Sequence, residues 1–221
     1  MGMSEEVLSG SSLFPREFEE ISHRCATLRS AKTTGDLGNL LATAVTKFTI
    51  FDLQVIGGRM REEIRKLPSP YREAVSPYFT EQVFGMHHRL IAQYRDGEFD
   101  RMESPITTRD LFDAFWEMVP VGCFSWDDGS EKRLTLYNPL HRFFYYLISA
   151  YTMFVLGLPG HPVGMPFPGS FWVEEKNGSY NCPIRDKEKD VFFSICNFCP
   201  ARQMEILIPE IRKKSEFHEV L

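Results

Sequence analysis

The chain has 221 residues, of which 43% are hydrophobic and 14% aromatic, a composition unlike that of a disordered protein. Its formal net charge of −5 excludes an overall basic surface for nucleic acid, and five cysteines, an odd number, argue against a disulfide framework. The first 14 residues hold acidic groups and no apolar run, so they predict a flexible segment rather than a secretory signal. We therefore expect a cytoplasmic protein that binds no nucleic acid.

One body of about five helices is predicted between residues 15 and 157, because apolar positions recur there at helical spacing. Proline and asparagine mark its boundaries, since proline is tolerated in a first turn and asparagine is a good N-cap. Pro120 is expected to stop the fourth helix, and Pro77 to divide the third near Val75. The predicted helices are 15–31, 36–67, 71–94, 107–119 and 139–157.

The fifth predicted helix is apolar on all sides. Asn138 is expected to cap it, with Pro139 in the first helical position. Residues 143–158 are the only membrane candidate, but they are shorter than the roughly 20 apolar residues that a spanning helix needs. The sequence therefore favours a buried central helix and no membrane association.

Residues 158–221 differ in character from the helical body. Residues 158–169 are rich in proline and glycine and predict an irregular loop. Aromatic segments on both sides of Asn177-Gly178 predict a β-hairpin. A short strand-like run, 191–195, precedes a predicted final helix that would begin at Pro200. The expected fold class is mostly α, with a small hairpin and a cysteine-rich segment packed on the body in a single domain.

Three cysteines of the C-terminal segment form the pattern that points most directly to chemistry. Cys196 and Cys199 are separated by two residues, so a tight turn can direct both sulfurs at one centre, and Cys182 supplies a third from the hairpin. His161 or Cys123 would be the fourth ligand. A Cys3His set suits zinc, whereas a set with Cys123, or with an open position, suits zinc or a [4Fe-4S] cluster.

Two other interpretations of these cysteines remain open. The chain could be a metal- or thiol-dependent enzyme that uses Cys196 and Cys199, because a helix beginning at Pro200 would lower the pKa of a thiol at its N-terminus. It lacks, however, the βαβ order in which such a motif usually works. Alternatively, the cysteines could be small core residues of a purely structural protein. An accessory, assembly or electron-transfer protein that binds a protein partner is the first hypothesis.

The C-terminal third also resembles a known family. The resemblance lies in Tyr137-Asn138-Pro139, in the run from Gly160 to Gly169, in Tyr180-Asn181-Cys182-Pro183 and in Cys196-Asn197-Phe198-Cys199. This succession resembles DUF2115, also called UPF0305, an uncharacterised family of methanogenic archaea. The resemblance implies a cytoplasmic protein of an anaerobe, a setting in which iron–sulfur ligation is plausible. It implies no activity.

Overall fold

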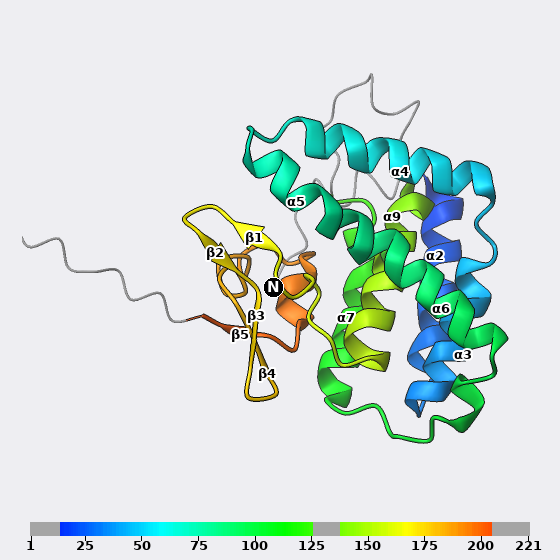
Figure 1. Ribbon diagram of the computed structural model, residues 1–221. Helices are drawn as coiled ribbons and strands as arrows, with labels where there is room; N and C mark the ends of the chain where they lie inside the picture. The colour runs from blue at the N-terminus through cyan, green and yellow to red at the C-terminus, as the bar shows by residue number, and fades with distance from the viewer. Residues whose placement is uncertain (1–13, 126–137, 205–221) are drawn as a thin grey trace, which may run out of the picture.

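The computed structural model describes residues 14–125 and 138–204. Figure 1 shows the helices gathered into one body, with the short strands lying together at its side. The fold is mostly helical with a small amount of β structure, as predicted. The predicted flexible N-terminal segment, except for residue 14, lies outside the described residues. The α-helices are α2 (Pro15–Arg29), α3 (Thr34–Val45), α4 (Ile50–Arg65), α5 (Tyr71–Thr80), α6 (Met86–Arg95), α7 (Arg109–Gly122) and α9 (Pro139–Ala150).

Shorter elements connect or extend these helices. Two of those found in the described residues are π-helical: η1 between α5 and α6, and η3 directly after α9. The π- and 3-10 segments are η1 (Glu81–Gly85), η2 (Phe99–Arg101), η3 (Tyr151–Val155) and η4 (Ile195–Phe198). The strands are β1 (Pro166–Phe167), β2 (Phe171–Trp172), β3 (Glu174–Lys176), β4 (Ser179–Cys182) and β5 (Arg202–Gln203).

The long helix predicted over residues 36–67 is in fact two helices, α3 and α4, which meet at 95°. A capping box starts the second one: Asp52 N donates to Thr49 Oγ1 at 3.2 Å, and Thr49 N donates to Asp52 Oδ2 at 2.8 Å. No single described helix is long and apolar enough to cross a membrane; only the bent pair α3 and α4 reaches that length and composition together.

The third and fourth helices also differ from their predictions in detail. Pro77 lies inside α5 without ending it, and η1 joins α5 to α6. Pro120 lies in the last turn of α7 rather than after it, where it removes only one backbone hydrogen bond. Thr108 precedes α7 with φ 55° and makes no side-chain cap bond. The predictions that Pro77 divides its helix and that Pro120 stops α7 were wrong.

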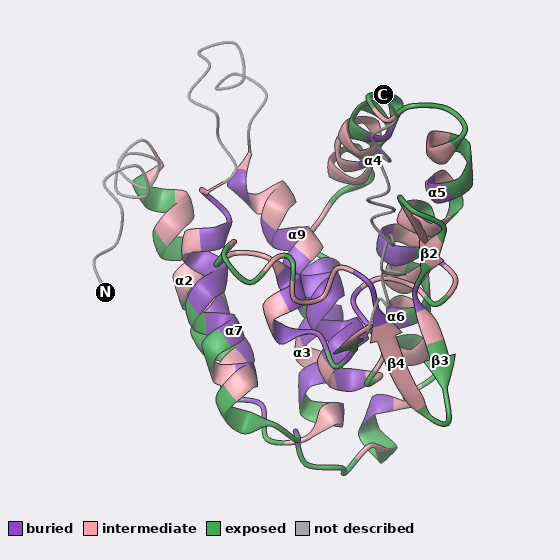
Figure 2. Ribbon diagram, turned by 90° about the vertical axis from the view of Figure 1, so that its left-hand side faces the viewer, coloured by how far each residue is buried: buried purple, intermediate pink, exposed green. Residues whose placement is uncertain are grey.

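The central position of α9 is confirmed. Asn138 Oδ1 accepts a hydrogen bond from Leu140 N at 2.9 Å, as expected of an N-cap before a first-turn proline. Figure 2 shows buried residues concentrated where α3, α7 and α9 meet, whereas α4 buries only Gly57 and Ile64. The buried side chains of α9 are Pro139, Phe143, Phe144, Tyr146, Leu147, Ile148, Ser149 and Ala150.

The predicted hairpin is present as β3 and β4, but the aromatic residues Phe171 and Trp172 are not part of it, because they lie in β2, which pairs with β1. Asn177 (φ 52°) and Gly178 (φ 72°) form its two-residue turn, which requires positive φ at both positions. Residues 191–195 form no strand, and Cys199 is followed by β5, which pairs in parallel with β4, rather than by the predicted final helix. The side chain of Gln203 stabilises this extended course, since its Nε2 donates to Pro183 O at 3.0 Å. Residues 205–221 lie outside the described part of the chain.

The C-terminal segment packs directly against the helices. The rings of Phe198 and Phe115 meet edge to face at 5.3 Å, and the Tyr146 hydroxyl donates to Phe193 O at 2.9 Å. Val173 and Ile195 belong to the same buried apolar core as the helices. The segment that carries the cysteines is therefore positioned by α7 and α9.

Candidate functional site

The structure brings three of the predicted ligands together, and we call Cys182, Cys196 and Cys199 the cysteine site. Cys182 ends β4, Cys196 lies in η4, and Cys199 follows η4 just before β5. Their exposed fractions are 2%, 3% and 6%, so all three are shielded from solvent. The charge of Cys199 raises the pKa of both other thiols, and Cys182 raises that of Cys196. The three sulfurs are thus close enough to interact electrostatically.

Backbone N–H groups point at two of these sulfurs. Cys199 Sγ accepts the N–H of Gly160 at 3.2 Å and a further backbone hydrogen bond from Ala201. Cys182 accepts backbone hydrogen bonds from Ile184 and Arg185. Hydrogen bonds of this kind stabilise the charged form of the acceptor, so they lower the pKa of both thiols. These donors therefore favour the thiolate form of Cys182 and Cys199, against the effect of burial.

Burial acts in the opposite direction. It is the largest influence on all three thiols and raises the pKa of each, that of Cys196 to about 12. The guanidinium of Arg185 lowers the pKa of Cys182 and Cys199, whereas Glu188 raises that of Cys196. The three thiols are therefore protonated at neutral pH. A bound cation would supply the charge that makes them thiolates.

The sulfurs do not surround a common point in this structure. Among residues 14–125 and 138–204, no group of three or more His, Cys, Asp or Glu side chains is arranged to hold a metal ion. The cysteine site is a set of neighbouring thiols: backbone N–H donors face Cys182 and Cys199, and the Ser194 side chain is hydrogen-bonded to Cys196.

His161 follows the residue whose N–H contacts Cys199. Burial alone lowers the pKa of His161 to about 4, so its imidazole is neutral at pH 7, the form that binds metals. Its ring meets that of Phe167 edge on, with centroids 5.5 Å apart. The backbone of the predicted imidazole ligand therefore lies beside the cysteine site.

Cys123 lies elsewhere, at the C-terminal end of α7 in the helical body. It is fully buried, and its thiol interacts with that of Cys25 on α2, which raises its pKa further. Cys25 is itself buried, as expected of a packed core cysteine. The arrangement groups Cys123 with Cys25 rather than with the three C-terminal cysteines.

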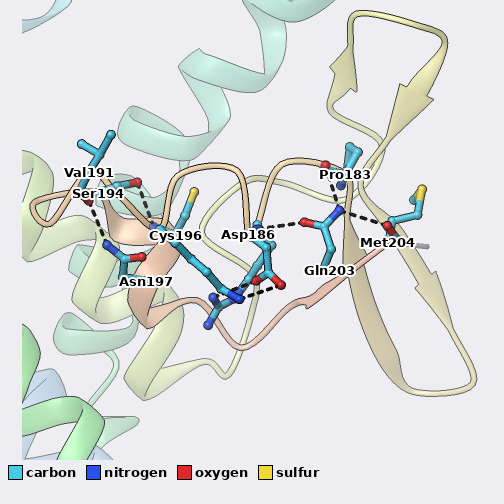
Figure 3. A network of polar contacts seen from close by, with 10 residues as sticks. Pro183, Asp186, Val191, Ser194, Cys196, Asn197, Gln203 and Met204 are labelled. Carbon is cyan, nitrogen blue, oxygen red and sulfur yellow. Dashed lines mark hydrogen bonds and ion pairs between the residues drawn. The ribbon is translucent and has the colours of Figure 1, made fainter. Parts of the chain in front are cut away.

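A network of side-chain to backbone hydrogen bonds fixes the chain around the cysteines (Figure 3). Gln203 donates to the carbonyl oxygens of Pro183 and Met204, both at 3.0 Å, and its Oε1 accepts the N–H of Asp186 at 2.8 Å. Asn197 Nδ2 donates to Val191 O at 2.8 Å. These bonds connect the loop between β4 and η4 to β5 and to η4.

Two residues from the helical body take part in the site without any local sequence signal. Gln82 of η1 donates from Nε2 to Gly160 O at 2.8 Å, and it is buried. The pKa of Tyr145 on α9 is raised by burial and also by Cys196 and Cys199, so its phenol lies near both thiols. Only the packing of helices on a distant loop brings these groups to the cysteines.

Neither of two surface pockets of the described chain is built from the cysteine site, although the second borders β3, the strand that pairs with β4. One of about 540 Å³ includes Asn39, Tyr94 and Asp100 in its lining, and one of about 310 Å³ includes Trp172 and Glu174. None of the five cysteines lines either pocket.

Comparison with known proteins supports the resemblance seen in the sequence. Residues 33–204 match the family described as an uncharacterised protein conserved in archaea, DUF2115. The match includes the helices from α3 onward as well as the cysteine site. No solved structure matches the chain significantly.

Relatives called UPF0305 proteins occur in methanogens. The protein of Methanopyrus kandleri is 39% identical over 137 residues, which cover 62% of this chain and 86% of that protein. The protein of Methanocaldococcus jannaschii is 23% identical over 178 residues, 78% of this chain and 97% of its own. A match to the protein of Methanothermobacter thermautotrophicus is 49% identical over 53 residues, but it spans only 24% of this chain and 34% of that protein.

Proposed function

This chain belongs to DUF2115, a family of uncharacterised proteins conserved in archaea, and we propose that its cysteine site holds a metal ion or an iron–sulfur cluster. One observation carries the proposal. Two neighbouring buried sulfurs, those of Cys182 and Cys199, accept backbone N–H hydrogen bonds. A protonated core cysteine has no need of such donors, whereas a thiolate ligand is stabilised by them.

The proposed ligands are the three cysteines and His161. A Cys3His set suits zinc, and three cysteines with an open position or another fourth ligand suit zinc or a [4Fe-4S] cluster. Metal binding is commonly coupled to local folding, because a complete site need not exist before the ion arrives. We expect the ion to draw the sulfurs of β4 and η4 together, with Arg185 offsetting part of the thiolate charge.

A thiol-based enzyme has less support. A nucleophilic cysteine needs a lowered pKa, but burial raises that of Cys196 to about 12. Cys199 follows a short 3-10 segment and precedes a strand, so no α-helix of the described chain begins next to it. We therefore propose a cytoplasmic accessory, assembly or electron-transfer protein that works with a protein partner.

Anaerobic purification followed by iron, sulfide and zinc analysis tests the metal site. The informative variant is Cys196→Ser with Cys199→Ser, and the matched control is Cys25→Ser with Cys123→Ser, which also removes two buried thiols but from the helical body. We expect about one ion or cluster per chain in the wild type and the control, and loss in the first variant. Absence of metal from the wild type would sink the proposal and leave a structural role for the thiols.

A further inference from the structure

Gln82 is unusual among the buried polar residues of the described chain. Three polar side chains are buried there: Gln82, Ser149 and Thr152. Ser149 and Thr152 bond to carbonyl oxygens one turn earlier in their own helix. Gln82 instead reaches a distant loop, where it bonds to Gly160. Burying an amide side chain costs free energy unless it gains a hydrogen-bond partner. The contact with Gly160 provides that partner, which indicates that Gln82 acts on this loop.

Gly160 connects Gln82 to the cysteine site. Its carbonyl accepts Gln82 Nε2 at 2.8 Å, and its own N–H donates to Cys199 Sγ at 3.2 Å. The position is also sterically confined, because a Cβ on Gly160 would lie 2.9 Å from Ile195 Cδ1. The orientation of this residue is therefore determined by contacts on two sides.

The segment that carries Gln82 supports the same interpretation. Gln82 lies in η1, the π-helical segment that joins α5 to α6. Such segments are rare, and they frequently occur at functional sites because the extra residue redirects side chains. Here Gln82 is directed into the protein, toward the loop at Gly160.

We propose that Gln82 is a positioning residue for the cysteine site: it orients Gly160 so that the N–H of Gly160 faces Cys199 and helps that sulfur retain a metal. The inference rests on the proposed function of the site. Gln82 would act only through Gly160 and would not itself be a ligand. Its loss should weaken metal retention without removing any sulfur.

The test compares Gln82→Met with Gln93→Met in the full chain. Gln93, on α6, also makes side-chain hydrogen bonds: it donates to Glu98 at 2.7 Å and accepts from the Tyr151 hydroxyl, and neither partner belongs to the cysteine site. In metal-free protein we expect Gly160 amide hydrogen exchange to accelerate about tenfold in Gln82→Met only. The amide of Leu158, which bonds to Thr152 O at 2.9 Å, should stay unchanged and so distinguish reorientation of Gly160 from general loosening.

The zinc-loaded proteins provide the second measurement. Transfer of zinc to a coloured chelator should be about tenfold faster from Gln82→Met than from wild type or Gln93→Met. Replacing zinc with cobalt should also shift the thiolate-to-cobalt absorption band in Gln82→Met alone. Gln82→Asn keeps the amide but is one methylene shorter, so its zinc transfer should also be faster and its cobalt band should also be shifted. This variant replaces Gln82→Met if Gln82→Met fails to fold.

The outcomes separate the two proposals. Unchanged Gly160 exchange in both Gln82 variants, or equal acceleration at Leu158, would overturn the positioning role. A wild type that binds no zinc and no cluster contradicts the proposed function instead. The exchange measurement on metal-free protein would still decide whether Gln82 orients Gly160.

Discussion

The hydroxyl of Tyr146 donates a hydrogen bond to the backbone carbonyl of Phe193 at 2.9 Å, and it thereby joins the central helix α9 to the chain that leads into Cys196. Tyr146 itself is fully buried. Since Cys196 follows Phe193 by only three residues, the position of η4 depends on α9. This contact couples the stability of the helical body to the arrangement of the cysteine site.

Tyr146→Phe should therefore lower the free energy of unfolding by about 1–2 kcal/mol, because the carbonyl of Phe193 loses its buried donor. Urea unfolding measures the change. Tyr94→Phe is the control, since Tyr94 is 42% exposed and should lose less than about 0.5 kcal/mol. Equal losses in the two variants would argue that the contact between α9 and Phe193 does not hold η4.

Gly160→Ala should lower stability by about 1–3 kcal/mol, because its new Cβ would lie 2.9 Å from Ile195 Cδ1 and 3.6 Å from Met153 Sδ. Gly58→Ala is the matched control. A Cβ on Gly58 meets nothing within 4 Å, and alanine is the better residue inside a helix, so stability should rise by about 0.5–1 kcal/mol. Thermal unfolding would reveal the opposite signs, and destabilisation by both changes would contradict the close packing seen at Gly160.

Local signals predicted part of this fold correctly. Asn138 before Pro139 and Asn177 before Gly178 act within a few residues, and both produce the expected helix start and turn. The break between α3 and α4 has a local signal too, the capping box of Thr49 and Asp52. It was missed because the apolar stripe continues across it, and periodicity alone favoured one helix.

The sequence predicted which cysteines form the site, but not the strand and the side chains that surround them. The spacing of Cys196 and Cys199 identified the thiols, and the structure places Cys182 with them. The strand after Cys199 depends on Gln203, which contacts Pro183, a residue 20 positions away in the chain. No local sequence pattern could therefore predict this strand. The role of Gln82 likewise arises from packing, since 78 positions separate it from Gly160.

Stability should decrease as the pH falls through the range in which His141 becomes protonated. Burial is the main influence on His141 and lowers its pKa, although Asp52, 3.3 Å away, raises it. The pKa of His141 in the folded chain is below the unfolded value of about 6.5, so on acidification the unfolded chain binds more protons than the folded chain. The neutral imidazole therefore stabilises the fold above about pH 6.5, and this stabilisation is lost as the pH falls toward the folded pKa. Urea unfolding between pH 7.5 and 5, in wild type and His141→Gln, measures the slope; an equally steep slope in the variant would assign it to other groups.

If the cysteine site holds an ion, as proposed, its removal should destabilise the C-terminal segment more than the helical body. Strands of two to four residues and the 3-10 segment η4 carry the cysteines, so this segment has few backbone hydrogen bonds of its own. A strong chelator under anaerobic conditions should therefore lower the unfolding temperature of wild type and of Cys25→Ser by several degrees. Cys182→Ser should start from the lower temperature and no longer respond. If chelation leaves the wild type unchanged while metal analysis shows that the ion has gone, the ion binds without supporting the fold, and the thiols are held by packing on α7 and α9 alone.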